Sequence, residues 1–160
     1  AHLFFSFIHI PKGDYSHKRQ CLIYLIVIRM IRGIFPAKAL LEKYNLKDIF
    51  DVLLYSTKLG NWAKFELGLK YQCKFFSELG LYYVLLSRMK TIITRNSIKK
   101  LYLVKNQIGN NSNNILNMDE ITLTLQLSLI SHGWIKGYIL QGRSLVVLAK
   151  KDPFPSMVGI

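Results

Sequence analysis

Glycine, proline and asparagine residues divide the first two-thirds of this 160-residue chain into segments whose apolar residues repeat with a helical period. These residues end helices because proline cannot continue the backbone hydrogen bonding and glycine readily adopts left-handed conformations. The connections between segments are short, so consecutive helices should pack antiparallel, as stacked helical hairpins. The expected helices cover residues 3–10, 16–32, 37–44, 49–59, 62–79 and 81–94.

After residue 94 the pattern changes. Residues 95–105 predict a short basic helix that starts at Asn96 or Ser97, and residues 107–117 form an Asn-rich stretch with no core-forming pattern. The next segment, 121–129, alternates apolar and polar residues, which favours a half-buried strand. Its flanks favour a helix instead, since residues 117 and 120 have capping-box spacing and a His-Gly pair follows. The local pattern leaves both alternatives open.

The C-terminal part predicts a β-hairpin. Residues 134–140 and 145–149 read as strands on either side of a glycine-containing turn at 141–144. A helical segment followed by such a hairpin is typical of a winged helix. We therefore expect a mainly α fold, with stacked helical hairpins in residues 1–94 and a winged-helix part with a small hairpin in residues 95–160.

The composition restricts the possible functions. Apolar residues make up 51% of the chain, so it is not a disordered basic tail. Its net charge of +13 favours an anionic partner: nucleic acid, an anionic membrane surface or an acidic protein. The apolar run at 21–28 is interrupted by Arg29 and is too short to span a membrane.

Sequence signals for catalysis are absent. The chain has no P-loop, no G-x-S-x-G and no H-E-x-x-H motif. Its four histidines and two cysteines do not have metal-site spacing. Cys21 and Cys73 are expected to be buried thiols, with one disulfide between them as the alternative. We predict no catalytic residue, no metal site and no cofactor.

Uncompensated basic residues indicate where an anion would bind. No acid occurs between Leu79 and Met118, where six cations fall, and on a helix residues 95, 99 and 100 lie side by side. An ordinary solvated helix face is the alternative interpretation. The predicted phosphate-contacting residues, on this helix and on the hairpin, are Arg95, Lys99, Lys100, Lys136, Arg143 and Lys150.

The segment that would be the recognition helix of a winged helix does not suit base reading. Residues 118–131 contain no Lys or Arg and begin with two acids, so binding should be to phosphate, dependent on salt and independent of sequence. The apolar surplus of this segment favours a protein-docking surface. Its predicted partner-binding residues, with one from the following hairpin, are Leu123, Leu127, Ile130 and Trp134.

Several short landmarks recur in a fixed order along the chain: Ile23-Tyr24-Leu25, Leu41-Glu42-Lys43-Tyr44, Gly60-Asn61, the stretch 85–105, Gly133-Trp134-Ile135-Lys136-Gly137-Tyr138-Ile139 and Lys151-Asp152-Pro153-Phe154-Pro155. In this order and spacing the chain resembles the PCI domain of the Thp1-like subunit of the nuclear transcription-and-export complex two. Between Lys105 and Asp119 that family usually has a further helix, where this chain has only the Asn-rich stretch.

The resemblance implies helical repeats followed by a winged helix, and makes residues 118–132 a helix. It also implies a non-enzymatic scaffold subunit for mRNA export, located in the nucleus, with the cytoplasm as a second location. The implied partners are a Sac3-like or GANP-like scaffold protein, a small acidic Sem1-like (DSS1-like) protein, and RNA or DNA, with no membrane. The alternative is a purely structural PCI subunit of a proteasome-lid-like or signalosome-like assembly that does not bind nucleic acid.

Overall fold

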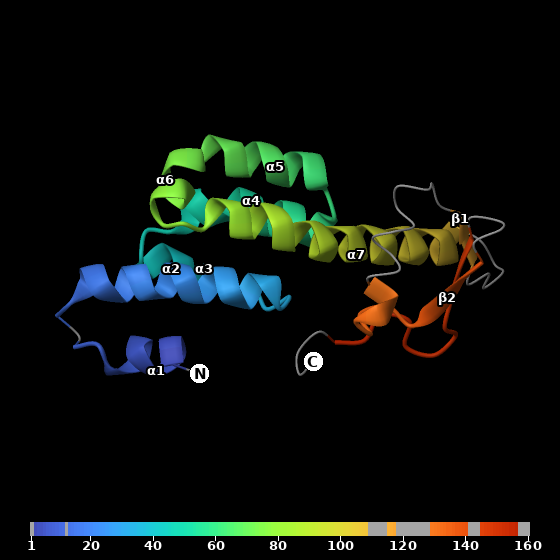
Figure 1. Cartoon of the computed structure of the whole chain (residues 1–160), viewed down its shortest axis with the longest axis horizontal. Helices are drawn as coiled ribbons and strands as arrows, with labels where there is room; N and C mark the ends of the chain where they lie inside the picture. The colour runs from blue at the N-terminus through green and yellow to red at the C-terminus, as the bar shows by residue number, and fades with distance from the viewer. Residues whose placement is uncertain (1, 12, 109–114, 118–128, 141–144, 157–160) are drawn as a thin grey trace.

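The computed structural model describes the chain except for residues 1, 12, 109–114, 118–128, 141–144 and 157–160 (Figure 1). The described part is mainly helical with a small antiparallel sheet near the C-terminus, as predicted. Its elements are, in chain order, α1 (His2–His9), α2 (Tyr15–Ile31), α3 (Lys38–Lys43), α4 (Lys47–Leu59), α5 (Trp62–Tyr71), α6 (Cys73–Glu78), α7 (Tyr82–Ile108), β1 (Ile115–Asn117), β2 (Gly137–Leu140) and β3 (Leu145–Leu148).

The helices stack around the long helix α7. Helix α4 packs against α5 and α7, and α7 also contacts α2, α5 and α6. Figure 1 shows α5 on one side of α4 and α7, α2 and α3 on the other, and the far end of α7 extending beyond the stack to the sheet. Helix α7 thus runs through the helical stack and on to the sheet.

The helical stack is held together by a core of fully buried side chains. Phe50, Phe65, Phe76, Met30 and Met89 are all completely inaccessible to solvent. Burying a side chain of this size stabilises a fold by roughly 1.5–3 kcal/mol. Because these residues come from α2, α4, α5, α6 and α7, the core ties all the principal helices of the stack together.

Most helix boundaries lie within one or two residues of the predictions, and the division into helices differs in two places. The single helix expected at 62–79 is divided at Gln72 into α5 and α6, and this break places the Phe76 ring edge-on to Phe50, with 5.7 Å between centroids. The helices expected at 81–94 and 95–105 are instead one continuous helix, α7. No glycine or proline interrupts that stretch, and buried Ile93 and Ile98 keep its apolar face continuous across the expected break.

The sheet has the strand order β1-β3-β2, with both pairings antiparallel. In β2 and β3, Tyr138 lies opposite Val147 and Leu140 opposite Leu145, which is the predicted hairpin. The predicted turn at 141–144 is outside the described residues. A second core forms beneath the sheet from Ile98, Leu116, Leu129, Ile135, Val146 and Leu148.

Strand β1 is a correction to the sequence analysis, which left residues 115–117 in a structureless stretch. Ile115 lies opposite Val147 and Asn117 opposite Leu145, so β3 becomes the central strand. Three residues are too few for a periodic pattern, and tertiary pairing with β3 determines their conformation. Of the segment 118–132, whose structure the sequence left open and the resemblance made a helix, residues 129–131 are helical and 118–128 lie outside the described residues.

Two smaller expectations concern thiols and membranes. Cys21 and Cys73 are both free, but Cys21 is only half-buried and Cys73 is exposed, so the prediction of two buried thiols is wrong. Cys73 is the first residue of α6, directly after the break that separates α6 from α5, whereas the prediction assumed one uninterrupted helix. Among the described residues, no helix is both long and apolar enough to cross a membrane.

Candidate nucleic-acid interface

The C-terminal end of α4 lies directly against the middle of α7. Gly60 ends α4 in a left-handed conformation with φ of +74°. A Cβ atom at this position would clash with the backbone of Ser97. Glycine therefore serves twice, by allowing the positive φ and by letting two backbones approach closely.

Asn96 fixes this junction with hydrogen bonds. Its side-chain Nδ2 donates to the carbonyl oxygen of Thr57, at 2.9 Å, and so satisfies one of the last carbonyl groups of α4. Its Oδ1 accepts from Nη1 of Arg95 at 3.4 Å. The backbone geometry at Gly60 and the side chain of Asn96 together hold the end of α4 in a fixed position on α7.

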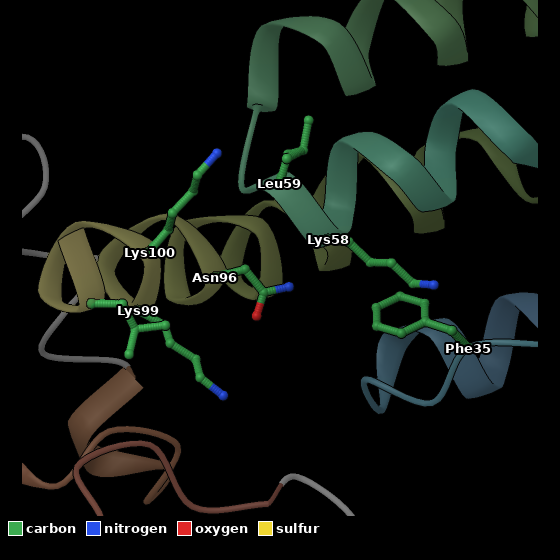
Figure 2. A pocket seen from close by; sticks show the side chains of 7 residues that line it. Phe35, Lys58, Leu59, Asn96, Lys99 and Lys100 are labelled. Atoms are coloured by element: carbon green, nitrogen blue, oxygen red, sulfur yellow. The ribbon is translucent and has the colours of Figure 1, made fainter. Parts of the chain in front are cut away.

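A hollow of about 400 Å³ opens beside this junction, and we call it the basic groove. Figure 2 shows Asn96 near its centre, Lys99 and Lys100 on α7 to one side, and Lys58 next to the ring of Phe35 on the other. Asn96, Lys99, Lys100 and Leu103 share one side of α7 because they are spaced three to four residues apart. The lining consists of Phe35, Lys58, Leu59, Asn96, Lys99, Lys100 and Leu103.

The groove is positively charged and also partly apolar. Lys58, Lys99 and Lys100 are exposed, no acidic residue lines the groove, and among the described residues none of the three forms an ion pair with a carboxylate. The ammonium nitrogen of Lys58 lies 5.4 Å from the ring centroid of Phe35, a cation–π contact. The three ammonium groups around this hollow repel each other. An anion bound there would be attracted by all three and would relieve that repulsion.

Arg95 is a correction to the predicted phosphate-contacting strip. Its side chain is buried, with 5% exposed, and donates from Nε to the carbonyl oxygen of Trp134 at 3.0 Å and from Nη2 to that of Pro155 at 2.6 Å. Burial lowers the pKa of the guanidinium from its usual value, and the charge of Asp152 acts in the opposite direction. Arg95 therefore fastens the C-terminal segment to α7 and is not available to phosphate.

Of the other residues predicted to contact phosphate, those that the structure describes lie in different surroundings. Lys99 and Lys100 lie on the basic groove, and Lys150 is exposed beyond β3. Lys136 is also exposed, but its ammonium forms an ion pair with Asp152 at 3.1 Å. Arg143 lies outside the described residues. The structure thus brings two of the six predicted residues together in one hollow.

The predicted docking residues are only partly described. Ile130 and Trp134 are half-buried, and Leu123 and Leu127 lie outside the described residues. Trp134 packs against both hydrophobic cores, so its ring links the helical stack to the sheet. Much of its surface is therefore already used within the chain.

The apolar half of the groove and one of its lysines are not predicted by the sequence pattern. Lys58 carries a weak signal, because it lies in the last turn of a helix that ends at a glycine. Phe35, Leu59 and Leu103 carry none, since their proximity depends on how α4 and the α2–α3 connection pack against α7. Within the described residues, no group of three or more His, Cys, Asp or Glu side chains is arranged to hold a metal ion.

The fold and the groove together define a mainly helical protein with a small C-terminal sheet and a basic groove. No family model matches the chain. Comparison with curated proteins is more informative. The chain is 36% identical to a PCI domain-containing protein of Schizosaccharomyces pombe, over 95% of the chain and 38% of that protein.

Two further relatives also match nearly the whole chain. A PCI domain-containing protein 2 homologue of Drosophila melanogaster is 30% identical over 98% of the chain and 42% of that protein, and a protein CSN12 homologue of Gibberella zeae is 29% identical over 90% and 37%. The chain is thus a relative of the PCI domain-containing proteins along nearly its whole length. It spans about two-fifths of the length of these curated relatives.

Proposed function

We propose that this chain is the PCI domain of a non-enzymatic scaffold subunit in a nuclear mRNA-export complex. The similarity to PCI domain-containing protein 2 homologues and the mainly helical fold with its C-terminal sheet support this proposal. The partners would be a Sac3-like or GANP-like scaffold, a small acidic Sem1-like (DSS1-like) protein, and RNA or DNA. The scaffold would dock on the segment that contains Leu123, Leu127, Ile130 and Trp134.

The observation that carries the nucleic-acid part is the cluster of Lys58, Lys99 and Lys100 in the basic groove without an acidic neighbour in its lining. Ammonium groups that neutralise phosphates release condensed counterions, which makes binding steeply dependent on salt. Lys150 extends the exposed positive charge to the sheet unit. Binding through these residues would be to the backbone of RNA or DNA and independent of sequence.

Fluorescence anisotropy with labelled RNA at several salt concentrations tests this part. Replacing both Lys99 and Lys100 by Glu should reduce affinity by about tenfold or more and lower the slope of log affinity against log salt by about two. The matched control replaces the exposed residues Lys64 and Lys74 by Glu, which makes the same change in net charge away from the groove. Equal losses in both variants would contradict the assignment to the groove.

The second candidate is a purely structural subunit of a signalosome-like or proteasome-lid-like assembly. The similarity to the protein CSN12 homologue favours it. Under this proposal the positive charge serves an acidic protein partner, and the chain binds neither RNA nor DNA even at low salt. The same anisotropy titration separates the two candidates.

A further inference from the structure

We infer that the basic groove seats one nucleotide of a single strand, with its base against Phe35, Leu59 and Leu103 and its phosphates on the lysines. This inference rests on the proposed nucleic-acid role and deepens it in two ways. It adds Phe35, Lys58, Leu59 and Leu103 to the site, and it makes the site selective for single strands over duplexes.

The composition of the groove lining supports a nucleotide. A duplex presents mainly phosphate to a hollow of this kind, because its bases are stacked inside, so the apolar side chains would have no partner. A single strand offers both an anionic backbone and a flat apolar base. Proteins that bind single strands without sequence preference combine these same two features, a basic groove and aromatic platforms.

The size of the groove is also suitable. Its volume of about 400 Å³ is at the lower end of the range typical of small-ligand pockets, which is roughly 300–1,000 Å³. Leu103 is 49% exposed at the groove, a large apolar surface facing solvent. A base that packs against this side chain would remove it from water.

The polar groups of the groove favour a nucleotide over an acidic peptide. A peptide brings backbone N–H and C=O groups that need hydrogen-bond partners when they are buried. The groove's one uncharged polar side chain, Asn96, already donates to Thr57 and accepts from Arg95. Stacking of a base requires no such partners, which also predicts tolerance of any base sequence.

Binding would rearrange one contact that the structure shows. Lys58 now lies over the ring of Phe35. When a base takes that ring face, the flexible Lys58 side chain can swing its ammonium to the adjacent phosphate. In the bound state the Phe35 ring would contact the base in place of Lys58, and Lys58 would contact the phosphate in place of the ring.

The test compares an unstructured ten-nucleotide oligouridine RNA with a blunt RNA duplex of ten base pairs, by anisotropy at one salt concentration. The wild-type chain should prefer the single strand. Replacing Leu103 by Ser should weaken single-strand binding about threefold to tenfold and leave duplex binding unchanged, because the apolar contact between Leu103 and the base is lost while the charges remain. Leu103 belongs to neither core, so this variant should fold normally.

Phe35 supplies an independent variant. Phe35→Trp keeps a large ring, and its fluorescence should be quenched by the oligouridine and not by the duplex. The control is Tyr83→Ala, which removes a 79%-exposed aromatic ring outside the groove lining and should leave both affinities unchanged.

Three outcomes would overturn the inference. Equal loss of single-strand and duplex binding in Leu103→Ser would mean that the site recognises phosphate alone, and the proposed function would stand. Binding of an aromatic acidic peptide in a Leu103-dependent manner, without single-strand selectivity, would assign the groove to a protein. No RNA binding by the wild-type chain would overturn the proposed nucleic-acid role itself.

Discussion

The side-chain amide of Asn96 on α7 donates a 2.9 Å hydrogen bond to the carbonyl oxygen of Thr57 on α4, which lies 39 residues away in the chain. This bond fixes the end of α4 against the side of α7 that carries Lys99 and Lys100. The walls of the basic groove therefore depend on a helix-terminal contact that is not itself charged.

Replacing Asn96 by Ala should lower the free energy of unfolding by about 1 kcal/mol. The loss is moderate because the carbonyl of Thr57 also accepts a bond from the backbone N–H of Gly60, at 3.2 Å. Urea denaturation followed by circular dichroism would measure it. Affinity for RNA should fall as well, because the groove widens, whereas Lys74→Ala should change neither quantity.

Gly60→Ala should destabilise the chain far more than Gly80→Ala. Both glycines have a positive φ, +74° and +68°, so alanine is strained at both. A Cβ at Gly80 meets nothing within 4 Å, whereas one at Gly60 clashes with the backbone of Ser97. We expect a cost of about 1–2 kcal/mol at Gly80 from strain alone, and at least about 1–3 kcal/mol more at Gly60 from overpacking. Equal melting temperatures for the two variants would refute the close approach of α4 and α7.

Arg95→Met should destabilise the chain by about 2–4 kcal/mol, because the part-buried carbonyl groups of Trp134 and Pro155 would lose their donor. Arg95→Lys should cost less, since one ammonium can restore part of the bonding. Urea denaturation followed by tryptophan fluorescence is the measurement. Arg95→Met also removes the charge, so under conditions where this variant is folded the salt dependence of its RNA binding should still match the wild type, and a slope lower by about one would place Arg95 on the binding surface after all.

Asp14 should make the stability of the first helices dependent on acid. Its side chain accepts bonds from the ring and the backbone N–H of His17, and these bonds lower its pKa below the ordinary value of 3.8. A carboxyl group whose pKa is lower in the folded state stabilises the fold above the unfolded value. That contribution is lost as the pH falls through the folded pKa. Asp14→Ala should therefore be less stable than wild type at neutral pH, and the two melting temperatures should converge in strong acid.

The local pattern predicted much of the helical stack. Gly33, Asn45, Gly60 and Gly80 lie at or just beyond helix ends, and the hairpin of β2 and β3 was predicted from two short strands around a turn. These features depend on a few neighbouring residues, which is why they are readable. The start of α2 shows the limit of such predictions, since Asp14 caps a helix that begins at Tyr15, one residue before the predicted start at residue 16.

The candidate site was less predictable. Arg95 and Lys99 are one helical turn apart on α7, and both are basic residues in a stretch without acids, yet Arg95 is buried and Lys99 is exposed. The difference arises because the segments that contain Trp134 and Pro155 cover the first and leave the second in solvent.

The sequence by itself determined the helical class, the hairpin and the strong positive charge, because each follows from residue type and short-range spacing. Only the tertiary structure decided which cations face solvent, that β1 pairs with β3, and that Phe35 and Lys58 meet Lys99 and Lys100 around one groove. The physical reason is that such contacts depend on the packing of segments distant in the chain. Their free energy comes from the buried cores that bring those segments together, and no short stretch of sequence contains that information.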